Sequence, residues 1–497
     1  MVRFKALLLV ALLAVMSVAT MFGQISSSTG AIQGTVMDPS GAVVSNATVK
    51  LTNTSTGVVE ATIITKGNGG FVFPLLVPGS YQIEVQAQGF NSSSIEGIVV
   101  EVTKVSVLKA ALKVGQVTSE VTVDASAQLV DTITATTGDV LASAQIKSTP
   151  LPTRNFLNLT TLQAGVSATM QSAAVVGAGA PVIEVAGQRS INNNYVLDGV
   201  DANNFGSNSL SSAAVPNPDA VEEFRVNTSM YDASQGRSSG GNINAIIKSG
   251  TDKFHGSVFE FNRNTAYNAN DFFFNQNHAP RPVLLQNQFG GTIGGPIPKL
   301  GQTFWFFSYQ GTRQVNGVSS AVTGSQPVLP ARTPGMSAAQ YTTALAAAFG
   351  VPAASIDPVA VNLLLAPGQY GGYLFASASG APGTIGNVAI AIPTKYSANQ
   401  YVVSGDRQVT KTNHLSVKYF TSLSTQNVPT GGTTLGQGQT APANNYHLGI
   451  SDSQVITPNL VNQFDTGYTY LRSATTPNPN GVTNASVGIL AFTGAAL

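Results

Sequence analysis

The four histidines are the side chains in this sequence with the widest chemical repertoire, and their spacing does not assemble a site. They are His255, His278, His414 and His447. No two of them have the four-residue separation that places two metal ligands on one helix face. We expect each to lie at a strand start, in a loop or in a turn. The chain has no cysteine, which excludes disulfides, thiolate metal sites and a cysteine nucleophile. The sequence therefore predicts no metal site.

The acidic and glycine-rich motifs are also weak candidates for chemistry. Residues 198–203, Asp-Gly-Val-Asp-Ala-Asn, are similar to a calcium loop but lack the spacing and closing glutamate of an EF-hand, so a turn is expected there. The glycine pairs that begin at Gly290 and Gly294 lack the lysine and the strand-to-helix setting of a phosphate-binding loop. Since no nucleophile, base and orienting residue can be assembled, we expect no enzyme, no catalytic residues and no cofactor.

The composition indicates β structure with many loops. Only 9% of the 497 residues are charged, 43% are hydrophobic, and Gly (50) and Pro (25) are abundant. Turn-forming and β-branched residues are typical of strands joined by loops, and the apolar share is too high for a disordered chain. The net charge of +1, with scattered lysines and arginines, excludes a nucleic-acid-binding surface.

The first residues have the layout of a secretory signal peptide. Arg3 and Lys5 form a positive region, residues 6–16 are an unbroken apolar run, and small residues follow up to Gly23. An uncleaved anchor is the alternative, but the run is short for a spanning helix, which needs about 20 apolar residues. We expect a signal peptide at 1–23. No later stretch is apolar enough for a spanning helix, so residence in an outer membrane requires a β-barrel.

The region 30–112 has the pattern of a small β-sandwich. Apolar and polar residues alternate in segments such as 47–52 and 81–87, which buries one face of each strand. Turn clusters separate these short runs, as in a sandwich. Five ordered blocks resemble the carboxypeptidase regulatory-like domain, a transthyretin-like sandwich with no peptidase activity of its own: residues 34–41, 47–49, 69–73, 78–81 and 89–90.

The region 251–497 alternates as membrane β-barrel strands do. Apolar residues alternate with Ser416 and Lys418 in the segment 415–419, and residues 464–471 repeat the design. Strands of about ten residues with one lipid face and one lumen face are what a barrel needs. A soluble β-protein has the same period and is the alternative.

The barrel region contains an interruption and is short. The segment 315–395 is expected to be a long extracellular loop with a short helix over 337–349 that stops at Gly350. Barrels with a plugged lumen close with about 22 strands of about 9–11 residues, which would consume nearly all of residues 253–497. We therefore expect a partial antiparallel barrel, from a fragment or a truncated gene product.

Three blocks in the region 131–250 resemble the plug domain of TonB-dependent outer-membrane receptors: residues 187–200, 216–226 and 231–251. The resemblance implies a small α/β domain seated in the barrel. The plug motif comprises an apolar–Asp–Gly–apolar step at Asp198 and Gly199, and the glutamates Glu222 and Glu223 before the strands that lead to the barrel.

The linker 113–130 contains one segment with a possible mechanical role. Glu120, Val121, Thr122 and Val123 resemble a TonB box, an extended segment that pairs by strand addition with the periplasmic energy coupler. Because such pairing uses main-chain hydrogen bonds, a last strand of the sandwich or a plain linker fits these residues about as well.

The blocks within 253–313 resemble the Oar-like TonB-dependent receptors, so the resemblance covers nearly the whole chain. It implies a receptor in the outer membrane, in contact with lipid, that binds an extracellular ligand and takes it up with energy from a TonB-type coupler. The ligand class stays open between a metal chelate, a peptide and a glycan. The alternative is a secreted or surface-attached adhesin that binds carbohydrate or peptide without transport.

Overall fold

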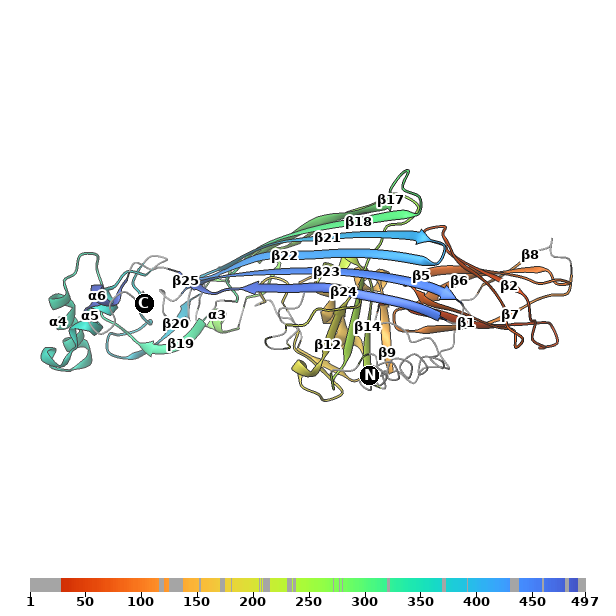
Figure 1. The fold of residues 1–497 in the computed structure, drawn as a ribbon. Coiled ribbons are helices and arrows are strands. Elements are labelled where there is room, and N and C mark those ends of the chain that lie inside the picture. The colour runs from red at the N-terminus through yellow and green to blue at the C-terminus, as the bar shows by residue number, and fades with distance from the viewer. Residues whose placement is uncertain are drawn as a thin grey trace, which may run out of the picture.

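A computed structural model gives the fold, in which three β-sheet bodies follow one another along the chain and short helices lie at one end of the longest strands (Figure 1). The signal peptide expected at 1–23 lies outside the described residues. The structure describes residues 28–115, 120–124, 137–151, 153–169, 175–179, 181–204, 215–229, 238–270, 272–276, 280–319, 322–368, 372–390, 392–429, 438–457, 460–478 and 482–489, with the single positions Gly206, Asn208, Gln235 and His278.

The first body is a β-sandwich. One sheet has three strands, in the order β4 (Gly70–Leu76), β1 (Gly30–Met37) and β7 (Val105–Ala111). The other sheet has five, in the order β3 (Val59–Ile64), β2 (Thr48–Asn53), β5 (Gly79–Gln86), β6 (Ser92–Val100) and β8 (Glu120–Asp124). The alternation seen in the sequence places every second side chain between the sheets, where Val49, Leu51, Tyr81, Ile83 and Val85 join one core.

The second body, which we call the plug, is a mixed sheet with short helical turns. Its strands run in the order β13 (Val200–Asp201), β12 (Asn194–Leu197), β15 (Asn242–Ile247), β14 (Val221–Ser229) and β9 (Thr137–Ala142). Only β12 and β15 are parallel in this order. Among the described residues, the helical part of the expected α/β domain is limited to α2 (Ser143–Ser148) and the 3-10 turns η2 (Phe156–Leu162), η3 (Ser190–Asn192) and η5 (Pro218–Ala220). A small hairpin of β10 (Val166–Ala168) and β11 (Ile183–Val185) completes the plug.

The third body, which we call the barrel sheet, is an antiparallel sheet of long strands. The order is β16 (His255–Arg263), β17 (Leu284–Pro296), β18 (Thr303–Asn316), β21 (Thr394–Thr410), β22 (Asn413–Val428), β23 (Gln439–Thr457) and β24 (Leu460–Ser473), and β25 (Thr476–Pro477) pairs with β23. Along β18 the buried side chains Phe306, Ser308 and Gln310 alternate with the more exposed Trp305 and Tyr309. This alternation separates an outer aromatic face from an inner face that contacts the plug.

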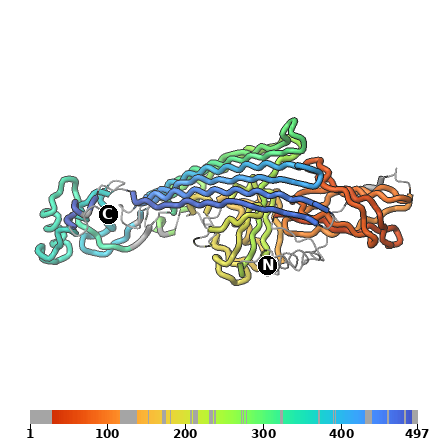
Figure 2. The backbone as a smooth tube through the Cα atoms, in the orientation of Figure 1, coloured from red at the N-terminus to blue at the C-terminus, as the bar shows by residue number. Residues whose placement is uncertain are grey.

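The plug packs against the inner face of the barrel sheet (Figure 2). The rings of Phe156 and Phe224 in the plug core lie 5.0 Å apart, centroid to centroid. Phe306, Val402 and Phe420 from three barrel strands are buried in the same core. The two bodies therefore share one apolar centre, around which polar contacts are arranged.

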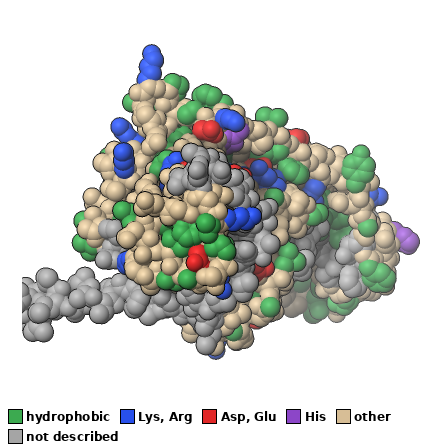
Figure 3. Space-filling model, turned by 90° about the vertical axis from the view of Figure 1, so that its right-hand side faces the viewer, with side chains coloured by type: hydrophobic (Ala, Val, Ile, Leu, Met, Phe, Trp, Pro, Cys, Tyr) green, Lys and Arg blue, Asp and Glu red, His purple; other side chains and the backbone are tan. Residues whose placement is uncertain are grey.

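The two ends of the barrel sheet differ. At the short-turn end the connections are brief: residues 297–302 join β17 to β18, and residues 411–412 join β21 to β22. The sandwich lies at this end (Figure 1). The opposite, long-loop end has the connections 264–283 and 317–393. In the view onto the sandwich end, basic and acidic side chains are dispersed among uncharged ones (Figure 3), which agrees with the net charge of +1.

The helix predicted over 337–349 is confirmed as α4 (Ala338–Phe349). The Ser337 hydroxyl accepts a hydrogen bond from the Gln340 amide, and Gly350 ends the helix with a φ of 65°, which glycine adopts without strain. The long-loop end also contains α3 (Phe272–Gln276), α5 (Pro358–Leu365), α6 (Asn484–Val487), the turns η7 (Thr265–Tyr267) and η8 (Ala353–Ser355), and the hairpin of β19 (Val322–Pro327) and β20 (Ile385–Ile390). Among the described residues, no helix is long and apolar enough to cross a membrane.

Candidate functional site

The Asp-Gly step of the plug motif forms the tight turn between β12 and β13. Leu197 pairs with Val200 across it, so Asp198 and Gly199 are the two turn residues, with φ values of 51° and 82°. A two-residue hairpin of this handedness requires a positive φ at both positions, which is why Asp-Gly is favoured there. The expectation of a turn rather than a calcium loop is confirmed at these residues.

The Asp198 side chain links the plug to the barrel wall. Its Oδ1 accepts hydrogen bonds from the Ile247 amide (2.9 Å) and from Lys418 Nζ (3.0 Å). Lys418, on β22, also donates to the Ile247 carbonyl (2.8 Å). Both charged side chains are 7% exposed. We call Asp198, Ile247 and Lys418 the latch. Breaking a buried ion pair on one side costs about 3–5 kcal/mol, because the other charge stays desolvated.

Neutral contacts from β23 and β24 surround the same turn. His447 Nε2 lies 3.2 Å from the Leu197 carbonyl, and since a carbonyl only accepts, that nitrogen carries a proton. The Thr469 hydroxyl donates to the Asp201 carbonyl (2.8 Å). A Cβ at Gly467 would lie 2.5 Å from a Val200 methyl group, so glycine lets the plug approach β24 closely.

A second ion pair joins η5 to the segment before η2. The Arg154 guanidinium binds the Asp219 carboxylate, and its Nε donates to Gln310 Oε1 on β18 (3.0 Å). The same guanidinium lies 4.4 and 4.2 Å from the ring centroids of Phe259 and Phe261 on β16. Burial lowers the pKa of Arg154, and the Asp219 charge opposes this effect. Arg154 thus ties two plug segments together and holds both against the barrel wall.

The rest of this interface is a wall of neutral side chains on β17, β18 and β21. These side chains bind plug main-chain groups: Gln288 with the Thr153 carbonyl (3.2 Å), Gln314 with the Gly177 amide (2.7 Å) and the Val175 carbonyl (3.0 Å), Asn316 with the Val175 carbonyl (3.1 Å), and Gln400 with the Val215 carbonyl (3.4 Å). Each neutral hydrogen bond is worth only about 0.5–1.5 kcal/mol, because water replaces it. Among the described residues, the pair of Asp198 and Lys418 is therefore the one ion pair that joins the plug to the barrel sheet.

The glutamates of the plug motif point in different directions. Glu222 and Glu223 are consecutive residues of β14, and successive side chains of a strand point to opposite faces. Glu223 accepts the Val102 amide of the sandwich (2.5 Å), and Arg225 donates to the Val102 carbonyl (3.2 Å). We call Val102, Glu223 and Arg225 the clamp. Burial raises the pKa of Glu223 to about 8.

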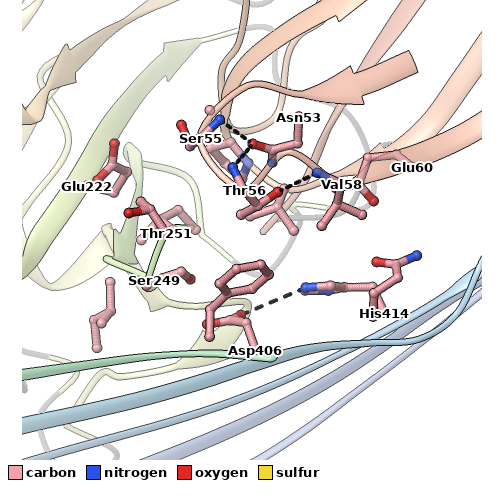
Figure 4. Close-up of a pocket in the computed structure, with 18 residues that line it drawn as sticks. Asn53, Ser55, Thr56, Val58, Glu60, Glu222, Ser249, Thr251, Asp406 and His414 are labelled. Carbon is pink, nitrogen blue, oxygen red and sulfur yellow. Dashed lines mark hydrogen bonds and ion pairs between the residues drawn. The ribbon is translucent and has the colours of Figure 1, made fainter. Parts of the chain in front are cut away.

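Glu222 instead faces a cavity of about 110 Å³ where the three bodies meet (Figure 4). Glu60 contributes from the sandwich, and Asp406 and His414 contribute from the barrel sheet, with His414 Nε2 4.0 Å from Asp406 Oδ1. Burial raises the pKa of Glu60 to about 7. Among the described residues, no group of three His, Asp or Glu side chains has the geometry to hold a metal ion.

The segment resembling a TonB box forms β8. Residues Glu120 to Asp124 pair in parallel with β6, from Ser92↔Glu120 to Glu96↔Asp124. Of the two alternatives to a TonB box that the sequence left open, the last strand of the sandwich matches this geometry. Among the described strands, β8 lies at the edge of its sheet with one neighbour.

Comparison with known proteins decides the family. Residues 246–496, half of the chain, match the model of the outer membrane beta barrel domain. The chain belongs to this outer membrane β-barrel family. It is therefore an outer-membrane protein, and its sandwich matches the carboxypeptidase regulatory-like domain over residues 31–113.

One curated relative of this β-barrel protein is the TonB-dependent transporter Oar of Myxococcus xanthus, with 27% identity over 287 residues. The match covers 52% of this chain, and the chain spans about a quarter (25%) of the length of that relative. The predicted resemblance to Oar-like TonB-dependent receptors is confirmed, and this relative is a transporter, not an enzyme.

Solved structures of outer-membrane transporters and receptors are also similar. The outer membrane transporter YddB from Escherichia coli matches with 12% identity and a TM-score of 0.44 over 68% of this chain and 39% of that chain. A mutant ferric enterobactin receptor from Pseudomonas aeruginosa matches with 12% identity and a TM-score of 0.33 over 69% of this chain and 47% of that chain.

The sequence did not predict that His447 and Lys418 lie at the interface between the plug and the barrel sheet of this β-barrel protein. His447 was expected at a strand start, loop or turn, and this was wrong: it lies within β23, fully buried against the plug. In the sequence, Lys418 was only one polar residue in a segment where apolar and polar residues alternate. A lysine on the inner face of a barrel strand is the signal that could have marked it, since a buried charge requires a partner.

Proposed function

We propose that this chain provides the plug and barrel strands of a TonB-dependent outer-membrane transporter, with the plug held in place by the latch. The observation that supports this most is the buried pair of Asp198 and Lys418 within an otherwise largely neutral interface. A plug that must leave its site needs a restraint that is firm at rest and lost in one step. One ion pair among exchangeable amide contacts has this property.

The energy coupler binds at β8 in this proposal. A strand with an open edge accepts a further strand through main-chain hydrogen bonds. The residues carried over from the TonB-box resemblance, Glu120 to Val123, form most of β8. A pull on β8 would then have to reach the plug and separate Asp198 from Lys418.

The ligand binds at the long-loop end in this proposal. Membrane barrels have short periplasmic turns and longer extracellular loops, which orients the loops 264–283 and 317–393 toward the outside and the sandwich toward the periplasm. The outer aromatic side chains Trp305, Tyr309, Tyr468 and Tyr470 then face lipid. The ligand class stays open.

Binding of the purified periplasmic domain of a TonB-type coupler to the full chain in detergent tests this function. Val121→Pro removes a main-chain donor from β8 and is expected to weaken binding at least tenfold. The control Val121→Thr keeps the donor and a β-branched side chain and should bind like the parent. Equal binding of the proline variant and the parent would overturn the role of β8.

A further inference from the structure

The turn between β6 and β7, which carries Val102, is firmly fixed to the sandwich. Lys104 Nζ lies 2.8 Å from a Glu101 carboxylate oxygen, and the Thr103 amide donates to the Thr29 carbonyl (2.9 Å). The Ala31 amide donates to the Lys104 carbonyl (3.0 Å) at the start of β1. These bonds tie the turn to β1, which pairs with β7 along its length. Movement of the sandwich core therefore moves Val102.

The plug binds this turn through both main-chain groups of Val102. Val102 is fully buried, and Glu223 and Arg225 are 6% and 3% exposed. The two side chains are two residues apart on β14, so they extend from the same face of the strand. Glu223 takes the Val102 amide and Arg225 the Val102 carbonyl. The clamp therefore resists displacement of the turn along β14 as well as away from it.

The clamp lies directly beside the latch. Glu223 is paired with Ile246 on β15, and Val221 with Ile247. Ile247 donates its amide to Asp198 and accepts from Lys418 through its carbonyl. Glu223, which binds the sandwich, is therefore paired with the residue next to Ile247, which binds Lys418 of the barrel sheet.

A second, covalent route from β8 to the plug runs through residues 125–136, which connect Asp124 to Thr137, the first residue of β9.

We propose that the sandwich is a coupling arm: a load on β8 reaches the latch through its pairing with β6, through the clamp and through β14, and not only through the covalent connection 125–136. This inference rests on the proposed function, in which β8 receives the pull. The clamp then determines whether movement of the sandwich moves the plug with it.

Single-molecule force measurement on the full chain in a supported bilayer tests the arm. Because the chain has no cysteine, Asp124→Cys supplies one attachment point at the end of β8. In this background the extension at the first plug-release event is recorded. Adding Glu223→Ala removes the acceptor for the Val102 amide and should move the event to a longer extension, because the sandwich can then move without the plug.

Two matched variants distinguish a loss of force transmission from a general destabilisation of the plug. Glu223→Gln keeps an acceptor for the Val102 amide and should release at the parent extension. Glu222→Gln changes the neighbouring glutamate, which does not bind Val102, and should also behave as the parent. Equal release extensions in the Glu223→Ala variant and the parent would overturn the proposal. The load is applied through the attachment point that Asp124→Cys supplies, so this outcome does not depend on whether the coupler binds β8. The Val121→Pro measurement decides that question separately.

Discussion

Replacing Lys418 by methionine should loosen the plug more than any other single change at the interface. The substitution keeps the length of the side chain but leaves the Asp198 carboxylate, 7% exposed, without its ion-pair partner. Removing one partner of a buried pair costs about 3–5 kcal/mol. About 1.4 kcal/mol corresponds to a tenfold change in an equilibrium constant. The population of the open plug should therefore increase by on the order of a hundredfold or more.

Hydrogen exchange at the Ile247 amide measures this effect, because that amide donates to Asp198. In the full chain held in a bilayer, exchange in the Lys418→Met variant should be faster by on the order of a hundredfold. The double variant with Asp198→Asn should recover much of the protection. Asparagine accepts a hydrogen bond from the same amide, tolerates a positive φ, and carries no charge that would be left without a partner. Exchange at the parent rate in the single variant would refute the assignment of the latch.

Three further changes probe the clamp, the turn and the second ion pair. The pKa of Glu223 is raised from 4.5 to about 8, so the docked sandwich favours the protonated acid. Docking should be strongest below about pH 4.5 and weaken as the pH rises through 8; the melting temperature of Glu223→Gln should lack this dependence. Gly199→Ala places a Cβ at a φ of 82° and should destabilise the plug by about 1–2 kcal/mol, measured by exchange at Ile247. Arg154→Lys loses the planar group between Phe259 and Phe261 and should cost about 1–2 kcal/mol in urea unfolding followed by the single tryptophan, Trp305; an unchanged midpoint would contradict that role.

The sequence was sufficient for features set by neighbouring residues. Alternation in residues 47–52 and 81–87 predicted strands with one buried face, and they form β2 and β5 of the sandwich. The pair Asp198 and Gly199 predicted a turn because few residues adopt a positive φ. Gly350 marked the end of a helix by its capping preference.

The sequence could not predict contacts between distant segments. Asp198 and Lys418 are 220 residues apart, and no local pattern distinguishes this lysine from a solvated one. Glu223, and not its neighbour Glu222, meets the sandwich 121 residues away. The register of β14 against β15 decides this, and register depends on the assembled sheet.

The most direct test of this account is labelling of a single cysteine, Val200→Cys, in cells. Val200 packs against Gly467 of β24 in the latched plug, so a thiol at this position should react slowly with a polar maleimide. In energised cells that contain the TonB-type coupler, the account predicts faster labelling than in cells without the coupler, and faster labelling in both strains when Lys418→Met is added. Labelling that is equally slow in all four strains would contradict a plug held by the latch and released by the coupler.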